Sequence, residues 1–171
     1  GIASLDICSG SFQINEVCSK DIFLSEIERL SPKEIIISDC FSASKMLDPN
    51  ICVNKKSLWE FDLDVAEKTL NSHFGTRDLT AFGCDDMKLG ISAAGCLLKY
   101  ALDTQRNDLS HIQKITTETQ SDKVILDPAS RKNLEIDQNL NGGTRNTLYE
   151  VMNTTATSMG ARLLRRMLNQ P

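Results

Sequence analysis

The sequence predicts an α/β domain with a mixed sheet, followed by a short all-helical segment that belongs to a second domain. Residues 2–8 and 12–18 are runs of strand-forming residues separated by a turn around Gly10. Residues 34–38 contain three consecutive isoleucines, which is typical of a strand covered on both faces. Between Ile91 and Leu102 the only charged residue is Lys99, which indicates a helix buried on most sides.

The first part of the chain supplies the sheet. The two runs around Gly10 predict an antiparallel hairpin. Residues 21–30 repeat apolar side chains at helical spacing, and Ser31-Pro32 ends that helix. A strand that follows a helix and lies beside a hairpin gives an α/β domain with a mixed sheet.

The middle of the chain is less regular until a second amphipathic helix. We expect a helical turn at 43–47, a short strand at 51–53, and Trp59 folded against the domain. Residues 62–74 have apolar positions on one side and form the second helix. Gly95 lies inside the central helix at a cost of about 1 kcal/mol relative to alanine, so we expect close packing there. Residues 111–117 and 123–126 are strands or extended connections.

The tail changes character near residues 121–123, where we place a domain boundary between 1–121 and 122–171. Asp127-Pro128 is an N-cap followed by proline at the first helical position. Residues 147–152 predict a short helix, and Thr157 can cap a last helix through residue 168. Nothing else in the chain is large enough to cover the apolar face of that helix. We therefore expect a truncated helical domain that self-associates through this face, formed by Leu163, Leu164, Met167 and Leu168.

Composition restricts the class of protein. The 171 residues have a formal net charge of −4, with seven Lys and Arg against five Asp and Glu from residue 122 onward, and twelve against eighteen before it. An acidic domain lacks the phosphate-neutralising surface that nucleic-acid binding needs. The six cysteines have no CxxC spacing and several lie within apolar runs, which favours reduced, buried structural thiols over a metal site. Without an apolar run of about 18 residues or a signal peptide, we expect a cytoplasmic protein with no membrane contact.

Several motifs, in the same order along the chain, resemble the DNA mismatch repair protein family MutS. Upstream motifs similar to the MutS connector domain are Leu5-Asp6-Ile7-x-Ser9-Gly10, Phe74-Gly75-Thr76-Arg77-Asp78 and Ala93-Ala94-Gly95-x-Leu97-Leu98-x-Tyr100. Tail residues similar to the start of the MutS core (lever) domain are Asp127, Arg131, Asn133-Leu134-Glu135-Ile136, Gly143, Thr147-Leu148, Thr155, Thr157 and Met159-Gly160-x-Arg162-Leu163-Leu164.

The resemblance implies a ribonuclease-H-like connector over residues 1–121 and the first helices of a core domain over 122–171. It implies a non-catalytic piece of a mismatch-recognition ATPase, with MutL, other MutS domains and a second MutS subunit as partners, and mismatched DNA bound through absent domains. The Phe-x-Glu wedge and the GxxxxGK[ST] phosphate loop are both absent from this sequence. We therefore expect no cofactor here, while ATP and Mg²⁺ would belong to the longer parent.

The resemblance also gives candidate site residues. The exposed face of the second helix implies a MutL contact, for which we select Asp64, Lys68, Thr69 and Asn71; a solvated helix face is the simpler account. Arg77 and Asp78 are candidates for a relay to a neighbouring domain, with a local ion pair between them as the simpler account.

Two other functions remain open from the residues. A metal-dependent nuclease of ribonuclease-H type would use Asp6 and Asp39, with Glu16 across the hairpin, because such sites need several convergent carboxylates. The simpler account of Asp6 is hydrogen bonding at the hairpin turn. A DNA contact would use Arg162, Arg165 and Arg166 on the last helix, which otherwise pair with acidic neighbours or water.

Overall fold

The computed structural model describes residues 1–42, 47–49, 51–105, 109–118, 126 and 128–169. The chain divides into two compact units, one formed by residues 1–24 and 30–119 and the other by residues 25–29 and 120–171. The expected boundary at 121–123, all but the last residue of the expected helical turn at 43–47, and the expected N-cap Asp127 lie outside the described residues. No helix in the described part of the chain has the length and apolar character needed to cross a bilayer.

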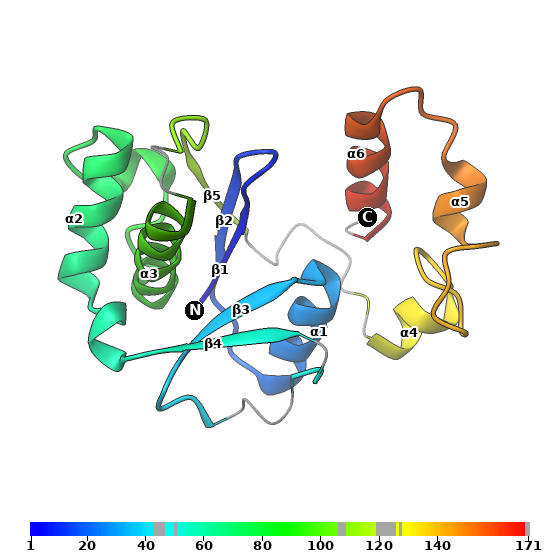
Figure 1. The fold of residues 1–171 in the computed structure, drawn as a ribbon, viewed down its shortest axis with the longest axis horizontal. Helices are drawn as coiled ribbons and strands as arrows, with labels where there is room; N and C mark the ends of the chain where they lie inside the picture. The colour runs from blue at the N-terminus through cyan, green and yellow to red at the C-terminus, as the bar shows by residue number, and fades with distance from the viewer. Residues whose placement is uncertain (43–46, 50, 106–108, 119–125, 127, 170–171) are drawn as a thin grey trace. The chain divides into compact units, whose positions relative to one another are not determined.

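The first unit contains two small sheets (Figure 1). In the first sheet, β1 (Ile2–Asp6) pairs antiparallel with β2 (Ser11–Asn15), as predicted, and β2 pairs parallel with β5 (Ile115–Thr117). In the second sheet, β3 (Glu34–Ser38) pairs parallel with β4 (Cys52–Lys56). The sequence predicted one mixed sheet, whereas the described residues form a mixed three-stranded sheet and a separate parallel pair.

The helices of this unit follow the predicted pattern closely. They are α1 (Lys20–Leu30), α2 (Leu63–Phe74) and α3 (Lys88–Gln105), with the short 3₁₀ turns η2 (Leu58–Phe61) and η3 (Thr80–Phe82) beside them. The middle of α1, residues 25–29, groups with the second unit. Helix α3 packs against α2 on one side and against β1 and β2 on the other (Figure 1). The core of the unit therefore lies around α3, as its apolar composition predicted.

The close packing expected at Gly95 is confirmed. A Cβ atom built at Gly95 would lie 2.3 Å from the Cβ and 2.4 Å from the Cα of Ala66 in α2. Both residues are buried, together with Leu70, Ala94 and Leu98 along the same contact. Real Cβ atoms do not approach a backbone so closely, so glycine is what lets α2 and α3 touch at this point.

Three expectations for the first unit need correction. Trp59 does not fold against the domain, because its side chain is 68% exposed on η2. The strand expected at 51–53 begins at Cys52 and continues through Lys56, since pairing with β3 satisfies its backbone. Only two of the six cysteines are buried, Cys84 and Cys96, and the other four are exposed.

The second unit contains three short helices: α4 (Pro128–Asn133), α5 (Leu148–Met152) and α6 (Ser158–Asn169). Thr147 caps α5 by accepting a hydrogen bond from the Glu150 amide, and the Thr157 hydroxyl accepts one from the Gly160 amide at the start of α6. The cap at Thr157 was predicted, whereas Thr147 was expected to be the first residue of the short helix and instead caps it. On α6, Leu163 is 52% and Met167 62% exposed. The expected self-association through this face remains a prediction.

Candidate partner-binding surface on helix α2

The candidate surface lies on α2, and both ends of this helix are capped. The Asp62 carboxylate accepts a hydrogen bond from the Val65 amide at 3.1 Å. At the other end Gly75 adopts a left-handed conformation, and its amide donates to the Asn71 carbonyl. Because α2 buries Ala66 and Leu70 against the core, its opposite face is held rigidly toward solvent.

The four predicted contact residues have different surroundings. Asp64 and Lys68 are exposed, while Thr69 and Asn71 are partly buried. The Thr69 hydroxyl donates to the Val65 carbonyl at 2.8 Å, which leaves its oxygen free to accept. The Asn71 amide oxygen accepts from the Thr76 hydroxyl at 3.0 Å, so this side chain also secures the end of the helix. Lys68 is therefore the exposed charge beside the accepting oxygen of the partly buried Thr69, and Asp64 is the other exposed residue of the four.

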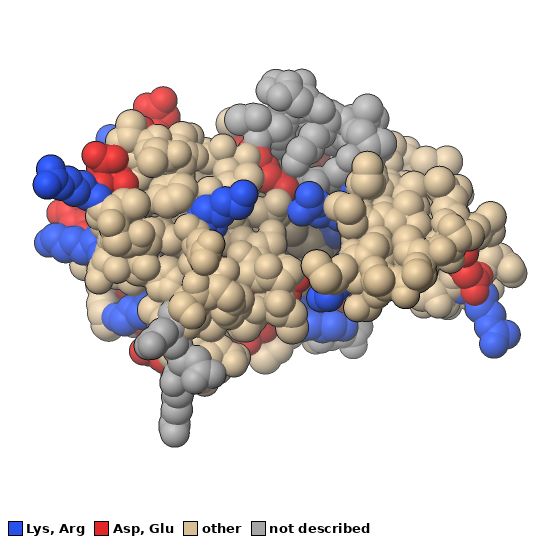
Figure 2. Space-filling view, turned by 90° about the horizontal axis from the view of Figure 1, so that it is seen from above, with Lys and Arg blue, Asp and Glu red and all other residues tan. Residues whose placement is uncertain are grey.

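An open hollow lies beside these two residues. Its lining is formed by two consecutive turns of α2 and the last turn of α3, and consists of Lys68, Thr69, Ser72, His73 and Leu102. The His73 ring is fixed by a 3.1 Å hydrogen bond from Nε2 to the Ile112 carbonyl oxygen. Charged side chains of both signs surround the end of the unit that carries α2 (Figure 2). The hollow offers an ammonium group, two hydroxyls and an apolar wall to a protein side chain.

Three lining residues were not predicted from the sequence. Ser72 and His73 follow Lys68 and Thr69 by four positions each, so helical periodicity contained the signal for them. The same periodicity places Asp64 and Asn71 on the other side of Lys68 from the hollow. Leu102 comes from a different helix, and no local pattern could identify it.

The relay candidates lie in the turn after α2, and both are exposed. The Asp78 carboxylate accepts from the amide of Thr80 at 3.2 Å and from its hydroxyl at 2.6 Å, which orders the entry to η3. Among the described residues no ion pair joins Arg77 to Asp78, so the simpler account given above does not hold in this structure. Arg77 is exposed in a turn that the Asp78 contacts order.

The carboxylates of the alternative nuclease site are engaged locally. The Asp6 carboxylate accepts from the Cys8 amide at 3.0 Å and the Ser9 hydroxyl at 2.6 Å, as the hairpin-turn account predicts. The Asp39 carboxylate accepts from the Ser38 hydroxyl at 3.3 Å, beyond the end of β3. Glu16 accepts from the Gly90 amide at 2.9 Å. In the described ranges, no three His, Cys, Asp or Glu side chains gather in a way that would hold a metal ion.

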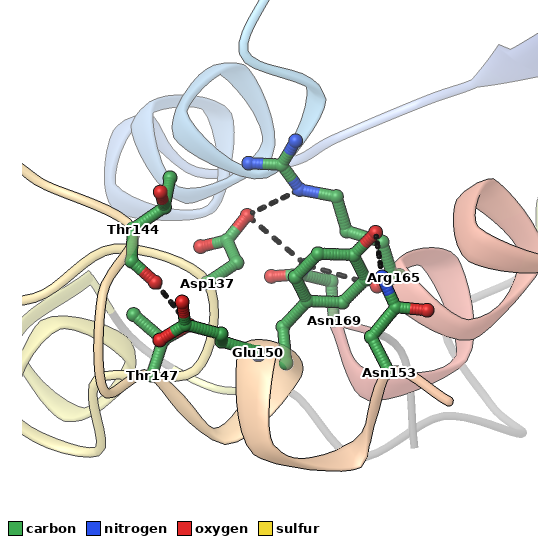
Figure 3. Close-up of polar contacts among 8 residues, drawn as sticks. Asp137, Thr144, Thr147, Glu150, Asn153, Arg165 and Asn169 are labelled. Atoms are coloured by element: carbon green, nitrogen blue, oxygen red, sulfur yellow. Dashed lines mark hydrogen bonds and ion pairs between the residues drawn. The ribbon is translucent and has the colours of Figure 1, made fainter. Parts of the chain in front are cut away.

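Of the three α6 arginines named above, Arg165 is engaged by side chains of the second unit (Figure 3). Arg165 donates from Nε to the Asp137 carboxylate at 3.0 Å, and its guanidinium lies 5.7 Å from the centre of the Tyr149 ring. Asn169 donates to the same carboxylate, and Arg162 donates to the Ser158 carbonyl oxygen. For Arg165 these contacts agree with pairing to an acidic neighbour, the account set against a DNA contact, whereas the Arg162 contact is with the backbone of its own helix.

The fold and the surface together define an α/β module joined to a helical module, with a candidate protein-binding surface on α2. Comparison with protein families assigns both modules. Residues 1–113 match MutS domain II, and residues 129–171 match MutS domain III. Because the first match alone covers more than half of the chain, this chain belongs to the MutS family. The predicted ribonuclease-H-like connector fold class and the predicted family are both confirmed.

Proposed function

We propose that this chain is the connecting piece of a MutS-type mismatch-recognition ATPase, and that the surface around Lys68 and Thr69 binds MutL. The single observation that carries the proposal is the hollow beside these two residues. It is built on two helices whose backbones touch, so the surface keeps its shape when the domain moves. In this role the chain performs no reaction of its own, and mismatched DNA and ATP are bound by other domains of the parent.

Rigid packing also supports the relay part of the proposal. Because only the Ala66 methyl group lies between α2 and α3 at Gly95, the two helices are packed closely enough to move together as one block. Arg77 and Asp78 lie in the exposed turn after α2, where a neighbouring domain of the parent could contact them. A relay further requires that these contacts differ between nucleotide states of the ATPase, since only differential contacts shift an equilibrium.

The test is a binding titration of this chain against purified MutL in the presence of a non-hydrolysable ATP analogue. Lys68→Glu combined with Thr69→Ala should weaken binding by about tenfold or more, as expected for central interface residues. Lys33→Glu is the matched control, because Lys33 is also an exposed lysine of this unit but lies before β3. Equal loss with both variants would indicate a general charge effect. Unchanged affinity in the double variant would move the site away from α2.

The relay has its own readout. In a MutS parent carrying this connector, Arg77→Ala should leave MutL binding to the isolated connector unchanged. It should reduce the ATP-dependent increase in MutL binding to the whole protein. A normal ATP response in that variant would remove Arg77 from the relay.

A further inference from the structure

Arg131, in α4, carries buried donor atoms that lack an acceptor. Its Nε and Nη1 atoms are buried and, among the described residues, neither has a hydrogen-bond partner. Burial and the neighbouring Arg29 lower the pKa of this guanidinium below its ordinary value. Three acids act on that pKa in the opposite direction, and in order of strength they are Asp137, Glu26 and Glu28. Because buried donors without acceptors destabilise a fold, we expect one of these acids to bind Arg131 in a second state of this unit.

Asp137 is the best placed of the three acids. Both carboxylate oxygens of Glu26 accept hydrogen bonds from Arg29. Glu28 is exposed to solvent. Glu135 adopts a left-handed conformation, with φ of 45°, two residues after the end of α4, so the chain turns between this helix and Asp137. Asp137 is therefore the acceptor that Arg131 can gain at the smallest cost to other contacts.

In the structure the Asp137 carboxylate binds α6 instead (Figure 3). Its Oδ2 atom accepts from Nε of Arg165 at 3.0 Å and from the side-chain amide of Asn169 at 3.4 Å. The Arg165 side chain is 47% exposed. Partly exposed ion pairs contribute little to stability, whereas a buried donor without an acceptor is costly. Asp137 can therefore leave Arg165 for Arg131 without a large loss of free energy.

We propose that Asp137 is a shared acceptor that exchanges between Arg165 on α6 and Arg131 on α4, and that this exchange releases α6. To reach the buried Nε and Nη1 atoms, the Asp137 carboxylate turns away from the exposed Arg165, so each pairing excludes the other. The released helix carries Leu163 and Met167, which are 52% and 62% exposed, and the exchange frees it to reorient them. The proposal does not depend on MutL binding at α2.

A stable bridge is the competing arrangement, in which the two oxygens of Asp137 bind both arginines at once. In a bridge Arg131 would support α6, so its removal would speed the opening of that helix. In an exchange Arg131 competes with α6 for Asp137, so its removal slows the opening. The direction of the change separates the two arrangements.

Hydrogen exchange followed by mass spectrometry on the whole chain measures the opening of α6, because a helix released from its side-chain contacts frays and exposes its amides. Arg131→Met keeps an apolar stem and removes the charge. It should slow exchange in α6 by about two- to fivefold, the size expected of a partly exposed ion pair, and Arg165→Ala should speed it by a similar factor. Helix α5 is the internal control, because it belongs to the same unit and its exchange should not change in Arg131→Met.

The effect of Arg131 should disappear with the shared acceptor. In an Asp137→Ala background, Arg131→Met should leave exchange in α6 unchanged. Glu28→Gln is the matched control for removing an acid near Arg131, and it should leave exchange in α6 as in the parent. Faster or unchanged exchange in α6 of Arg131→Met, equal slowing in α5 and α6, or slowing that persists with Asp137→Ala would each overturn the proposal.

Discussion

The contact between Gly95 and Ala66 makes a strong prediction about stability. In Gly95→Ala the new Cβ would lie 2.3 Å from the Ala66 Cβ and 2.4 Å from its Cα, so α2 and α3 must separate. Overpacking a core typically costs about 1–3 kcal/mol of unfolding free energy. Because the new Cβ would clash with a backbone atom, which cannot rotate away, we take the upper end of this range, about 3 kcal/mol. Alanine regains about 1 kcal/mol of helix propensity. The net loss should be about 2 kcal/mol of unfolding free energy.

Urea unfolding followed by far-UV circular dichroism measures this loss. With a slope of about 2 kcal/mol per molar urea, the midpoint should fall by about 1 M. Gly90→Ala is the matched control in the same helix, because the atom nearest to its built Cβ is 3.6 Å away, an ordinary contact. The reasoning is refuted if Gly95→Ala is as stable as Gly90→Ala. Adding Ala66→Gly should restore only part of the loss, because the clash with the Ala66 Cα remains.

Three further predictions concern other contacts. In the folded protein at pH 8, the four exposed thiols should react with a disulfide reagent, and Cys84 and Cys96 should react only after unfolding. The reason is that burial raises the pKa of the Cys84 thiol and raises that of Cys96 to about 11. Six fast-reacting thiols would contradict the fold. Glu16→Ala should cost about 1 kcal/mol in urea unfolding, because it removes the anion bonded to the α3 N-terminus, and Glu16→Gln should cost less. Arg165→Ala breaks the partly exposed pair with Asp137, so it should cost only about 1 kcal/mol or less and speed hydrogen exchange in α6.

Local patterns predicted most of the elements. The strand Glu34–Ser38 was predicted at its observed bounds, because three β-branched residues in a row restrict the backbone strongly. Helix α2 was predicted to within one residue of its observed bounds, because its apolar residues recur at helical spacing. The capping threonine of α6, Thr157, was also predicted, because a threonine before a helical apolar pattern is a helix start signal. These features depend on residues that are close in the sequence.

Features that depend on tertiary contacts were predicted less well. Strand β4 contains Lys55 and Lys56, which weaken its apolar pattern, yet pairing with β3 satisfies its backbone and the Lys56 ammonium lies 5.5 Å from the Tyr100 ring centre. Trp59 was expected to be buried because large aromatic residues usually are. Its exposure follows from how η2 meets α3, which no pattern within four residues can show. The exposure of four cysteines was also predicted wrongly, because apolar neighbours in the sequence do not decide which side chain faces the core.

The candidate surface on α2 combines both kinds of information. Lys68 and Thr69 were selected from the resemblance to MutS, and the helix period can add Ser72 and His73. Leu102 joins them only because α2 and α3 are held in one register, and the close approach of Gly95 to Ala66 sets that register. Gly95 is buried and does not line the hollow, yet it helps to determine the shape of the candidate surface. The same glycine that the sequence marks as costly for a helix is what brings the apolar wall of the hollow beside Lys68.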